Sequence, residues 1–258
     1  METSFHSRSL IVPAVILALG LVVATFVFSV AYRDVRKEVR TIDISGSAER
    51  VVASDTAKWS LSVSRQAEAN TLKDAATKLN ADSQAVSDYL KSNGIKPEEI
   101  TLQPPSVTPI CDSQGSTSYD RSGNPTCASS RLLGYALQQP MVIESKQVDK
   151  LTSLSQSAFS VLAARGIVLT GAGMEYYLAN LNDVKMQLLS DATKNAKERA
   201  DKILQGTGAT LGELESASVG VFQVTAVNST EISDYGAYDT AAQQKKVTSI
   251  VRATFKLK

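Results

Sequence analysis

The feature that most constrains this chain is a long apolar segment near its start. No charged residue occurs from Ser9 to Tyr32, and Leu10–Ala31 consists mainly of Leu, Ile, Val, Ala and Phe. At about 1.5 Å of rise per residue, some 22 helical residues reach roughly 33 Å, enough to cross the hydrocarbon core of a bilayer. We therefore predict a short tail over residues 1–9 and a transmembrane anchor over residues 10–32, with the lipid bilayer as its partner.

Two other interpretations of this segment exist. A cleaved secretory signal would use Ser29-Val30-Ala31 as its small-residue site, but the apolar region of such a signal is usually about 7–15 residues long. A buried helix of a soluble protein would need a polar face, and this segment has none. The uncleaved anchor is our prediction, and cleavage is the alternative.

The charges beside the segment bear on which side of the membrane the rest of the chain lies. Residues 33–40 form a charged collar with four basic residues, whereas only Arg8 precedes the segment. Taken alone, this bias favours a cytoplasmic domain, although large domains cross membranes largely regardless of charge.

The two cysteines argue for the opposite side. Cys111 and Cys127 lie in one polar loop, and neither has a His at metal-ligand spacing. A disulfide between them would restrict the unfolded loop, worth about 3 kcal/mol in the chain-entropy model, and such bonds persist in oxidising compartments. Two unrelated free thiols are the alternative. We predict the disulfide, and we expect the domain outside the cytoplasm.

The charge balance excludes one class of partner. Without residues 1–40, the chain keeps 22 basic and 23 acidic residues. A nucleic-acid-binding domain usually carries a strong basic patch. We therefore expect no nucleic-acid partner.

The remaining residues, 41–258, alternate between strand-like and helix-like patterns. Alternating apolar residues predict a hairpin near 42–63 and further strands near 100–102, 132–143, 167–178, 217–227 and 247–257. Apolar stripes at helical spacing predict three amphipathic helices, over Leu72–Leu90, Val148–Val161 and Leu181–Ile203. The first stripe includes Ala76, with Asn70 as the cap. These patterns predict an α+β domain, in which about three amphipathic helices pack on an antiparallel-rich sheet.

Several short motifs give this domain a family resemblance. Ser45-Gly46-Ser47-Ala48-Glu49, followed by Ser54-Asp55-Thr56-Ala57, resembles the opening of SIMPL domains, also known as the domain of unknown function 541. Leu90–Ile100 and Gly134-Tyr135 resemble later segments of that family. The Ala-rich third helix, with its exit at Gly206–Gly212, resembles the family's long helix and Gly-rich exit.

The resemblance covers nearly all of residues 41–258, and it carries expectations beyond the fold. It implies export to the periplasm or cell envelope, a link to stress tolerance and formation of homo-oligomers. It implies no catalytic residues. Ser54 stands where a Pro is common in the family, and the loops at 103–131 and 228–246 are variable regions, so these loops are where specificity is expected.

Catalytic and cofactor sites find little support in the residues. The only His is His6, in the tail before the apolar segment, so the domain lacks the His of a catalytic triad or of a common zinc site. Gly171-Ala172-Gly173 and Gly206-Thr207-Gly208 do not form a dinucleotide fingerprint and are interpreted as turns and a helix cap. Asp74, Asp82 and Asp88 are expected on solvated helix faces. We predict no enzymatic activity, no cofactor and no metal. The alternative is an enzyme that uses two carboxylates brought together by the fold, as glycosidases do.

Two functional hypotheses follow. The first is a membrane-anchored, extracytoplasmic protein with a structural or interaction role in the cell envelope, which associates with itself. The second is a binding module that captures a ligand or partner through the 103–131 and 228–246 loops. Tyr119, Tyr235 and Tyr238 are the candidate contact residues in these loops, since Tyr is enriched at interfaces.

Overall fold

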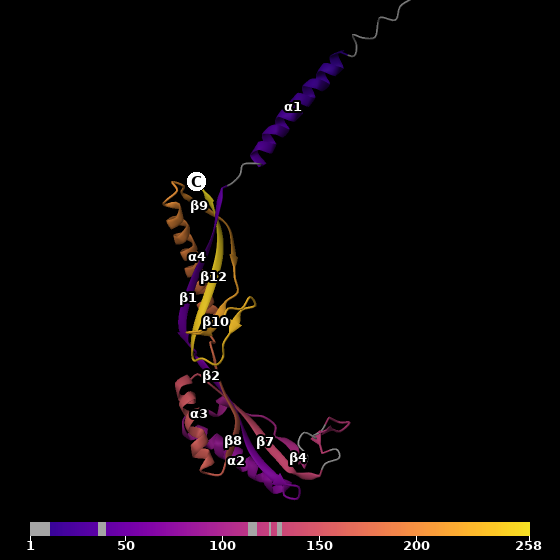
Figure 1. Cartoon of the computed structure of the whole chain (residues 1–258), viewed down its shortest axis with the longest axis vertical. Helices are drawn as coiled ribbons and strands as arrows, with labels where there is room; N and C mark the ends of the chain where they lie inside the picture. The colour runs from indigo at the N-terminus through magenta and orange to yellow at the C-terminus, as the bar shows by residue number, and fades with distance from the viewer. Residues whose placement is uncertain (1–10, 36–39, 113–117, 124, 128–130) are drawn as a thin grey trace, which may run out of the picture. The chain divides into compact units, whose positions relative to one another are not determined.

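Strands with alternating buried and exposed side chains dominate the computed structural model, which describes residues 11–35, 40–112, 118–123, 125–127 and 131–258. The strands are β1 (Thr41–Ala53), β2 (Thr56–Glu68), β3 (Ile100–Leu102), β4 (Ser106–Cys111), β5 (Ser118–Tyr119), β6 (Pro125–Thr126), β7 (Leu132–Ser145), β8 (Val168–Tyr177), β9 (Leu211–Val219), β10 (Gln223–Ala226), β11 (Ala237–Tyr238) and β12 (Gln244–Leu257). The helices are α1 (Ile11–Val35), α2 (Leu72–Ser92), the short 3-10 helix η1 (Pro97–Glu99), α3 (Val148–Ala163) and α4 (Leu181–Leu204) (Figure 1).

The described strands form two five-stranded sheets and one small hairpin. In the first sheet the order is β1-β12-β10-β11, with β9 also paired to β12; in the second it is β3-β7-β2-β8, with β4 also paired to β7. β5 and β6 form the hairpin. β10 and β11 pair in parallel. The pairs β10-β12, β2-β7, β2-β8, β3-β7, β4-β7 and β5-β6 are antiparallel. The fold is thus α+β and mostly antiparallel, as the sequence predicted, but the strands form two main sheets where a single sheet was expected.

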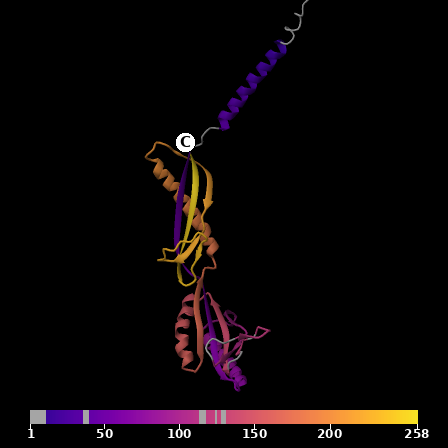
Figure 2. The same ribbon diagram turned by 45° about the vertical axis from the view of Figure 1, so that its right-hand side comes forward.

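The larger core lies on one face of the β3-β7-β2-β8 sheet. Every second residue of β2 points into it, and Trp59 and Leu61 stand opposite Ile143 and Met141 of β7. The helices α2 and α3 cover this face (Figures 1 and 2). Their buried side chains include Leu79, Val86, Leu90, Leu151, Leu154 and Leu162.

A smaller core lies between α4 and the other sheet. Val184 and Leu188 of α4 pack there with Val224 of β10 and Val247 of β12. The same alternation turns the neighbouring residues of β10 and β12 to the opposite face, which carries the groove described below.

The chain divides into two units. One contains the described residues up to Ile44 together with 197–217 and 253–258. Within it, the amide of Leu257 donates to the carbonyl of Arg40, and the amide of Lys258 donates to the carbonyl of Thr210, so the chain end is held beside β1 and β9. The other unit, 45–196 with 218–252, contains both cores and every side chain of the groove.

The predicted hairpin near 42–63 is wrong. β1 and β2 belong to different sheets, because the chain crosses between them at Ser54 and Asp55. The amide of Ser54 donates to the carbonyl of Gln243, and that of Asp55 donates to the carbonyl of Tyr177. The alternation of apolar and polar residues predicted the two strands correctly. Which strands pair with each other depends on contacts between residues far apart in the sequence.

Smaller predictions also need correction. The irregular segment 103–131 contains β4, β5 and β6, and the strand predicted at 217–227 is divided between β9 and β10. Three residues predicted on the buried helix faces are exposed, and a neighbour of each is buried instead. The exposed residues are Ala76, Val161 and Ile203, and the buried neighbours are Ala75, Leu162 and Leu204. Each buried neighbour lies four residues from another buried residue of its helix, as expected for one helix face. Thr71, rather than Asn70, is the N-cap of α2.

The helix α1 covers nearly all of the predicted anchor, residues 10–32. Within the part of the chain that the structure describes, no helix is both long enough and apolar enough to span a membrane.

Candidate ligand-binding groove

The first sheet carries an open groove of about 790 Å³ on the face opposite α4. Its floor includes Lys246 and Thr248 of β12, which lie directly opposite Thr225 and Gln223 of β10. Glu49 extends the lining onto β1. Because side chains alternate along a strand, the burial of Val224, Val247 and Val251 on the α4 side is what places these polar residues in the groove.

The loop 229–234, a part of the 228–246 segment, forms a wall of the groove. The amide Nε2 of Gln223 donates to the carbonyl of Ser233 at 2.6 Å, and its Oε1 accepts from the Ser233 amide at 3.4 Å. The Nζ of Lys246 donates to the carbonyl of Ser229 at 3.3 Å. Two floor side chains therefore hold the loop at both of its ends.

Apolar side chains line the groove without being buried by the chain. Val219, Val221 and Ile250 are each about half exposed, and Ile232 of the loop is 82% exposed. Exposed aliphatic side chains gathered in one concave surface are typical of binding sites. The groove is therefore suited to a ligand with an apolar part.

The charged residues of the groove are mainly acidic. Among the described residues of the lining, Glu49, Glu231 and Asp234 carry carboxylates, and Lys246 is the single basic residue. Its ammonium group already donates to the loop carbonyl of Ser229. Three carboxylates and one ammonium group give these described lining residues a formal charge of −2 at neutral pH.

The three predicted contact tyrosines do not form one surface. Tyr119 lies in β5 of the small hairpin and is 72% exposed, whereas Tyr235 follows the groove loop and is 97% exposed. Tyr238 has a structural role: its ring stacks on Tyr177 with centroids 6.3 Å apart, and its hydroxyl accepts from the amide of Leu178. Of the three, Tyr235 is the one beside the groove and free of the sheet.

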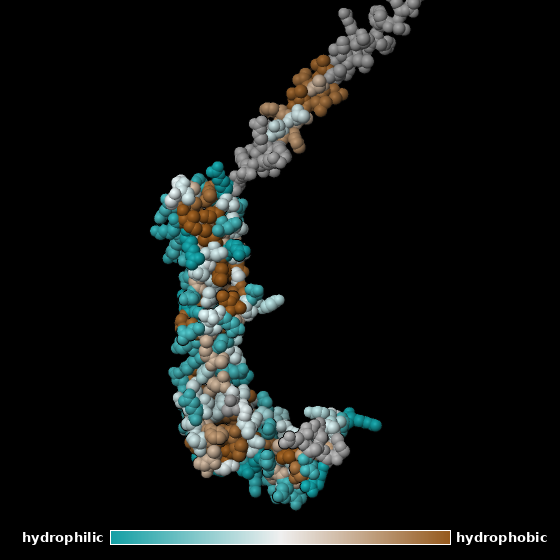
Figure 3. Space-filling view, viewed as in Figure 1, coloured by the Kyte–Doolittle hydropathy of each residue, from teal (hydrophilic) through white to brown (hydrophobic). Residues whose placement is uncertain are grey.

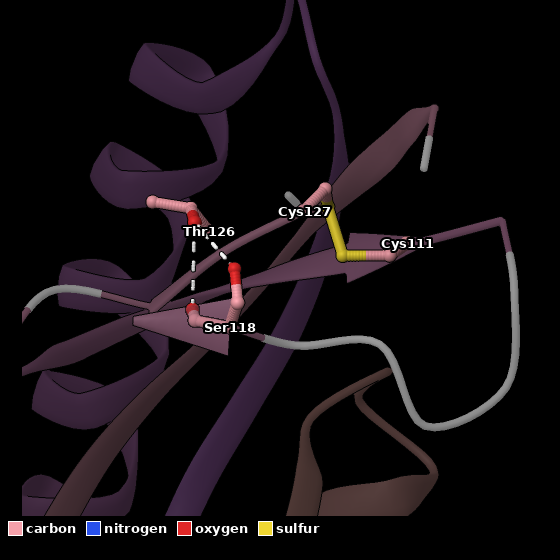
Figure 4. The surroundings of a disulfide bond; sticks show 4 residues. All are labelled: Cys111, Ser118, Thr126 and Cys127. Carbon is pink, nitrogen blue, oxygen red and sulfur yellow. Dashed lines mark hydrogen bonds between the residues drawn. A yellow bond between two sulfur atoms is a disulfide. The ribbon is translucent and has the colours of Figure 1, made fainter. Parts of the chain in front are cut away.

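The segment 103–131 contains the predicted disulfide, and its described residues do not line the groove. Cys111 at the end of β4 is bonded to Cys127, with Cα atoms 5.5 Å apart. Beside it, the hydroxyls of Ser118 and Thr126 lie 3.1 Å apart across the β5-β6 hairpin (Figure 4). The described parts of the two predicted binding loops therefore do not form one site.

Asp55, from the family-like opening motif, has a structural role. Its carboxylate accepts hydrogen bonds from the amides of Ala179 at 2.8 Å and Asn180 at 3.4 Å, directly before α4 begins. Amides at the start of a helix lack partners within the helix and favour a negative charge. Asp55 therefore fixes the start of α4 to the crossing between the two sheets.

Asp82 was predicted on a solvated helix face, and this is wrong. It is buried on α2 and forms a two-point ion pair with Arg65 of β2, in which one of the two bonds, Nη2 to Oδ1, measures 2.9 Å. The hydrogen bonds to Asp82 raise the pKa of Arg65 above its ordinary value. Asp74 and Asp88 are exposed, as predicted.

Lys245 was not anticipated as a buried residue, although it falls two residues before Val247 in the inward phase of β12. It is fully buried, and its Nζ donates to the carbonyls of Asp239 at 2.5 Å and Ala242 at 2.7 Å. Burial lowers the pKa of Lys245, and the nearby carboxylate of Asp239 partly opposes that shift. The ammonium group organises the turn between β11 and β12.

The two glycine-containing segments that were compared with a dinucleotide fingerprint have roles in backbone conformation. Gly208 has a positive φ of 75° just after α4, which is typical of the exit from a helix. Gly171 and Ala172 occupy a bulge in β8, since Ser60 pairs with Gly173 while Ser62 pairs with Thr170. The interpretation of Gly171-Ala172-Gly173 as a turn was therefore wrong. Among the residues that the structure describes, no group of three or more His, Cys, Asp or Glu could hold a metal ion.

Comparison with known proteins places these features in a family context. The family model SIMPL, described as a protein of unknown function (DUF541), matches residues 42–255. A protein of Edwardsiella ictaluri (strain 93-146), described as uncharacterized protein YggE, is 30% identical over 177 residues. The matched region covers 67% of this chain and 64% of that relative, so the chain spans less than two thirds of the relative's length.

Proposed function

This chain belongs to the SIMPL family, whose function is unknown, and on that premise we propose that it is a non-enzymatic binding module that acts outside the cytoplasm. The observation that carries the proposal is the groove of about 790 Å³ under the loop 229–234. Its size lies within the range of about 300–1,000 Å³ found for small-molecule sites, and its lining combines exposed aliphatic side chains with a few charged ones.

A ligand screen on two matched variants tests this proposal. Ile250→Arg places a bulky charge in the groove, and Val168→Arg makes the same change at a comparably exposed position on β8. Compounds that bind the groove raise the Tm of the parent protein and of Val168→Arg, but not that of Ile250→Arg. A screen whose hits stabilise both variants equally would remove the groove from consideration.

The location outside the cytoplasm is supported by the disulfide. Cys111 and Cys127 are the two cysteines of the chain, and they are bonded to each other. Such bonds persist in oxidising compartments and are rare in the cytosol. Alkylation of intact cells before lysis tests the location: protein that incorporates the alkylating label at both cysteines without reductant would contradict it.

The segment 10–32 provides the proposed membrane anchor. It lacks charged residues, and Phe26 and Phe28 of α1 remain largely exposed. Apolar residues of α1 are visible as brown atoms in Figure 3. After alkaline carbonate extraction, we expect the full-length chain in the membrane pellet and residues 41–258 alone in the supernatant. Recovery of a shortened chain lacking residues 1–31 would instead support the cleaved signal.

Self-association in the cell envelope is the second candidate function, and the order of the first sheet favours it. β1 lies at an edge of that sheet, and its Val51 is half exposed. An edge strand can pair with a strand of another molecule. Cross-linking in intact membranes, followed by light scattering of the full-length protein in detergent, should give a discrete oligomer that Val51→Arg weakens; a monomer in both measurements excludes this role.

A further inference from the structure

We propose that the groove binds a small organic cation with an apolar body, such as an alkylammonium compound. This inference rests on the proposed function, because it names the class of ligand that the groove would take. Three properties of the groove lead to it: the exposed aliphatic side chains in its lining, the excess of carboxylates and the fixed position of the loop.

The apolar part of the ligand would contact aliphatic side chains from three places in the chain. Ile250 belongs to β12, Val219 and Val221 lie around the turn between β9 and β10, and Ile232 lies on the loop. All four remain about half exposed or more in the free protein. Covering them with a hydrocarbon group removes apolar surface from water, which favours binding.

The charge of the ligand follows from the carboxylates. Glu49 on β1 and Glu231 and Asp234 on the loop line the same groove and are all exposed to solvent. The ammonium group of Lys246, the one basic side chain among the described lining residues, donates to the carbonyl of Ser229. An anion would therefore meet a net negative lining, whereas a cation would be attracted by it.

The groove is also held in shape before a ligand arrives. Gln223 binds Ser233 through both ends of its amide, and Lys246 binds the other end of the loop. A site that is already ordered loses less conformational entropy on binding. The backbone of the loop that carries Glu231 is therefore held beside the floor in the free protein.

The experiment uses the full-length chain in phosphatidylcholine nanodiscs, with ¹³C-labelled isoleucine methyl groups. Hexyltrimethylammonium, hexanoate and hexanol are titrated separately, so that the apolar body is kept and the charge varies. We expect saturable shifts of the Ile232 and Ile250 methyl signals with the cation, at an affinity at least about tenfold higher than with the other two probes. The difference should shrink as salt is added.

Matched variants show whether the carboxylates cause the preference. Glu49→Gln, Glu231→Gln and Asp234→Asn together should weaken cation binding about tenfold, whereas Asp74→Asn, Glu98→Gln and Glu213→Gln together should leave it unchanged. All six residues are exposed, so neither set is expected to disturb the fold.

The outcomes separate the inference from the proposed function. Equal binding of all three probes, or unchanged cation binding in the groove variant, overturns the cation preference and leaves the groove as a ligand site. No methyl shift at Ile232 or Ile250 with any probe overturns both.

Discussion

A side chain on Gly46 has no space beside Ala192. A Cβ atom added to Gly46 of β1 would lie 2.2 Å from the carbonyl oxygen of Ala192 and 2.4 Å from the amide nitrogen of Ala196 on α4. Both alanines are completely buried. A glycine on the strand and alanines on the helix therefore let the two backbones approach closely, which explains the Gly of the opening SIMPL motif in physical terms.

Gly46→Ala should lower the free energy of unfolding by about 3 kcal/mol, because the methyl group would push apart two backbones that cannot yield locally. Thermal unfolding followed by circular dichroism measures the change. The matched control is Gly173→Ala on β8, where an added Cβ meets nothing within 4 Å. The control should change stability by less than about 1 kcal/mol. Similar effects of the two substitutions would show that β1 and α4 are not closely packed.

Asp82→Ala should destabilise the protein by about 2 kcal/mol, since it leaves the guanidinium group of Arg65 partly buried without its ion-pair partner. The effect stays below that of a fully buried pair because the Arg65 side chain is 31% exposed. Asp88→Ala, which removes an exposed carboxylate from the same helix, is the control and should have little effect. Urea unfolding of both single variants and of the double variant Arg65→Met/Asp82→Leu measures these changes. The double variant should recover much of the free energy of unfolding that Asp82→Ala loses. A double variant less stable than Asp82→Ala would contradict the pairing argument.

Lys245 should make stability depend on pH in the alkaline range. Its folded-state pKa is lowered by burial from the ordinary value of 10.5, so between the lowered value and 10.5 the unfolded chain binds more protons than the folded protein. The contribution of this lysine to stability therefore rises with pH across that window, and it is lost as pH falls through the folded pKa. Unfolding curves of the parent and Lys245→Met between pH 8 and about 10.5 measure it. The parent should gain stability relative to the variant as pH rises; a constant difference would count against the shift.

Gln223→Ala should loosen the loop 229–234, because it removes both hydrogen bonds to Ser233. Hydrogen–deuterium exchange should become faster at the amides of this loop, with little change in the two cores. Gln138→Ala is the control, since Gln138 is exposed on β7 of the other sheet. Unchanged exchange in the loop would mean that Gln223 does not hold it, and would weaken the case for a preformed groove.

The floor of the groove shows how far the sequence leads and where it stops. The alternation in 247–257 correctly placed Val247, Val251, Ala253 and Phe255 on one buried face. It did not show that Lys246 and Thr248 would face Thr225 and Gln223, because that requires the pairing of β12 with β10. The segment 228–246 was expected to carry specificity because it is a variable region of the SIMPL family, and part of it does form a wall of the groove.

By itself, the sequence determined the α+β class, the approximate positions of most helices and strands, the pairing of Cys111 with Cys127 and the SIMPL resemblance. These features depend on local periodicity, on there being two cysteines, and on short motifs. The tertiary structure alone decided that β1 and β2 separate into two sheets, that Asp82 pairs with Arg65, and that Lys245 is buried among main-chain carbonyls. Each of these depends on partners brought together by chain crossings and strand register, and contacts between residues far apart in the sequence leave no local pattern from which to predict them.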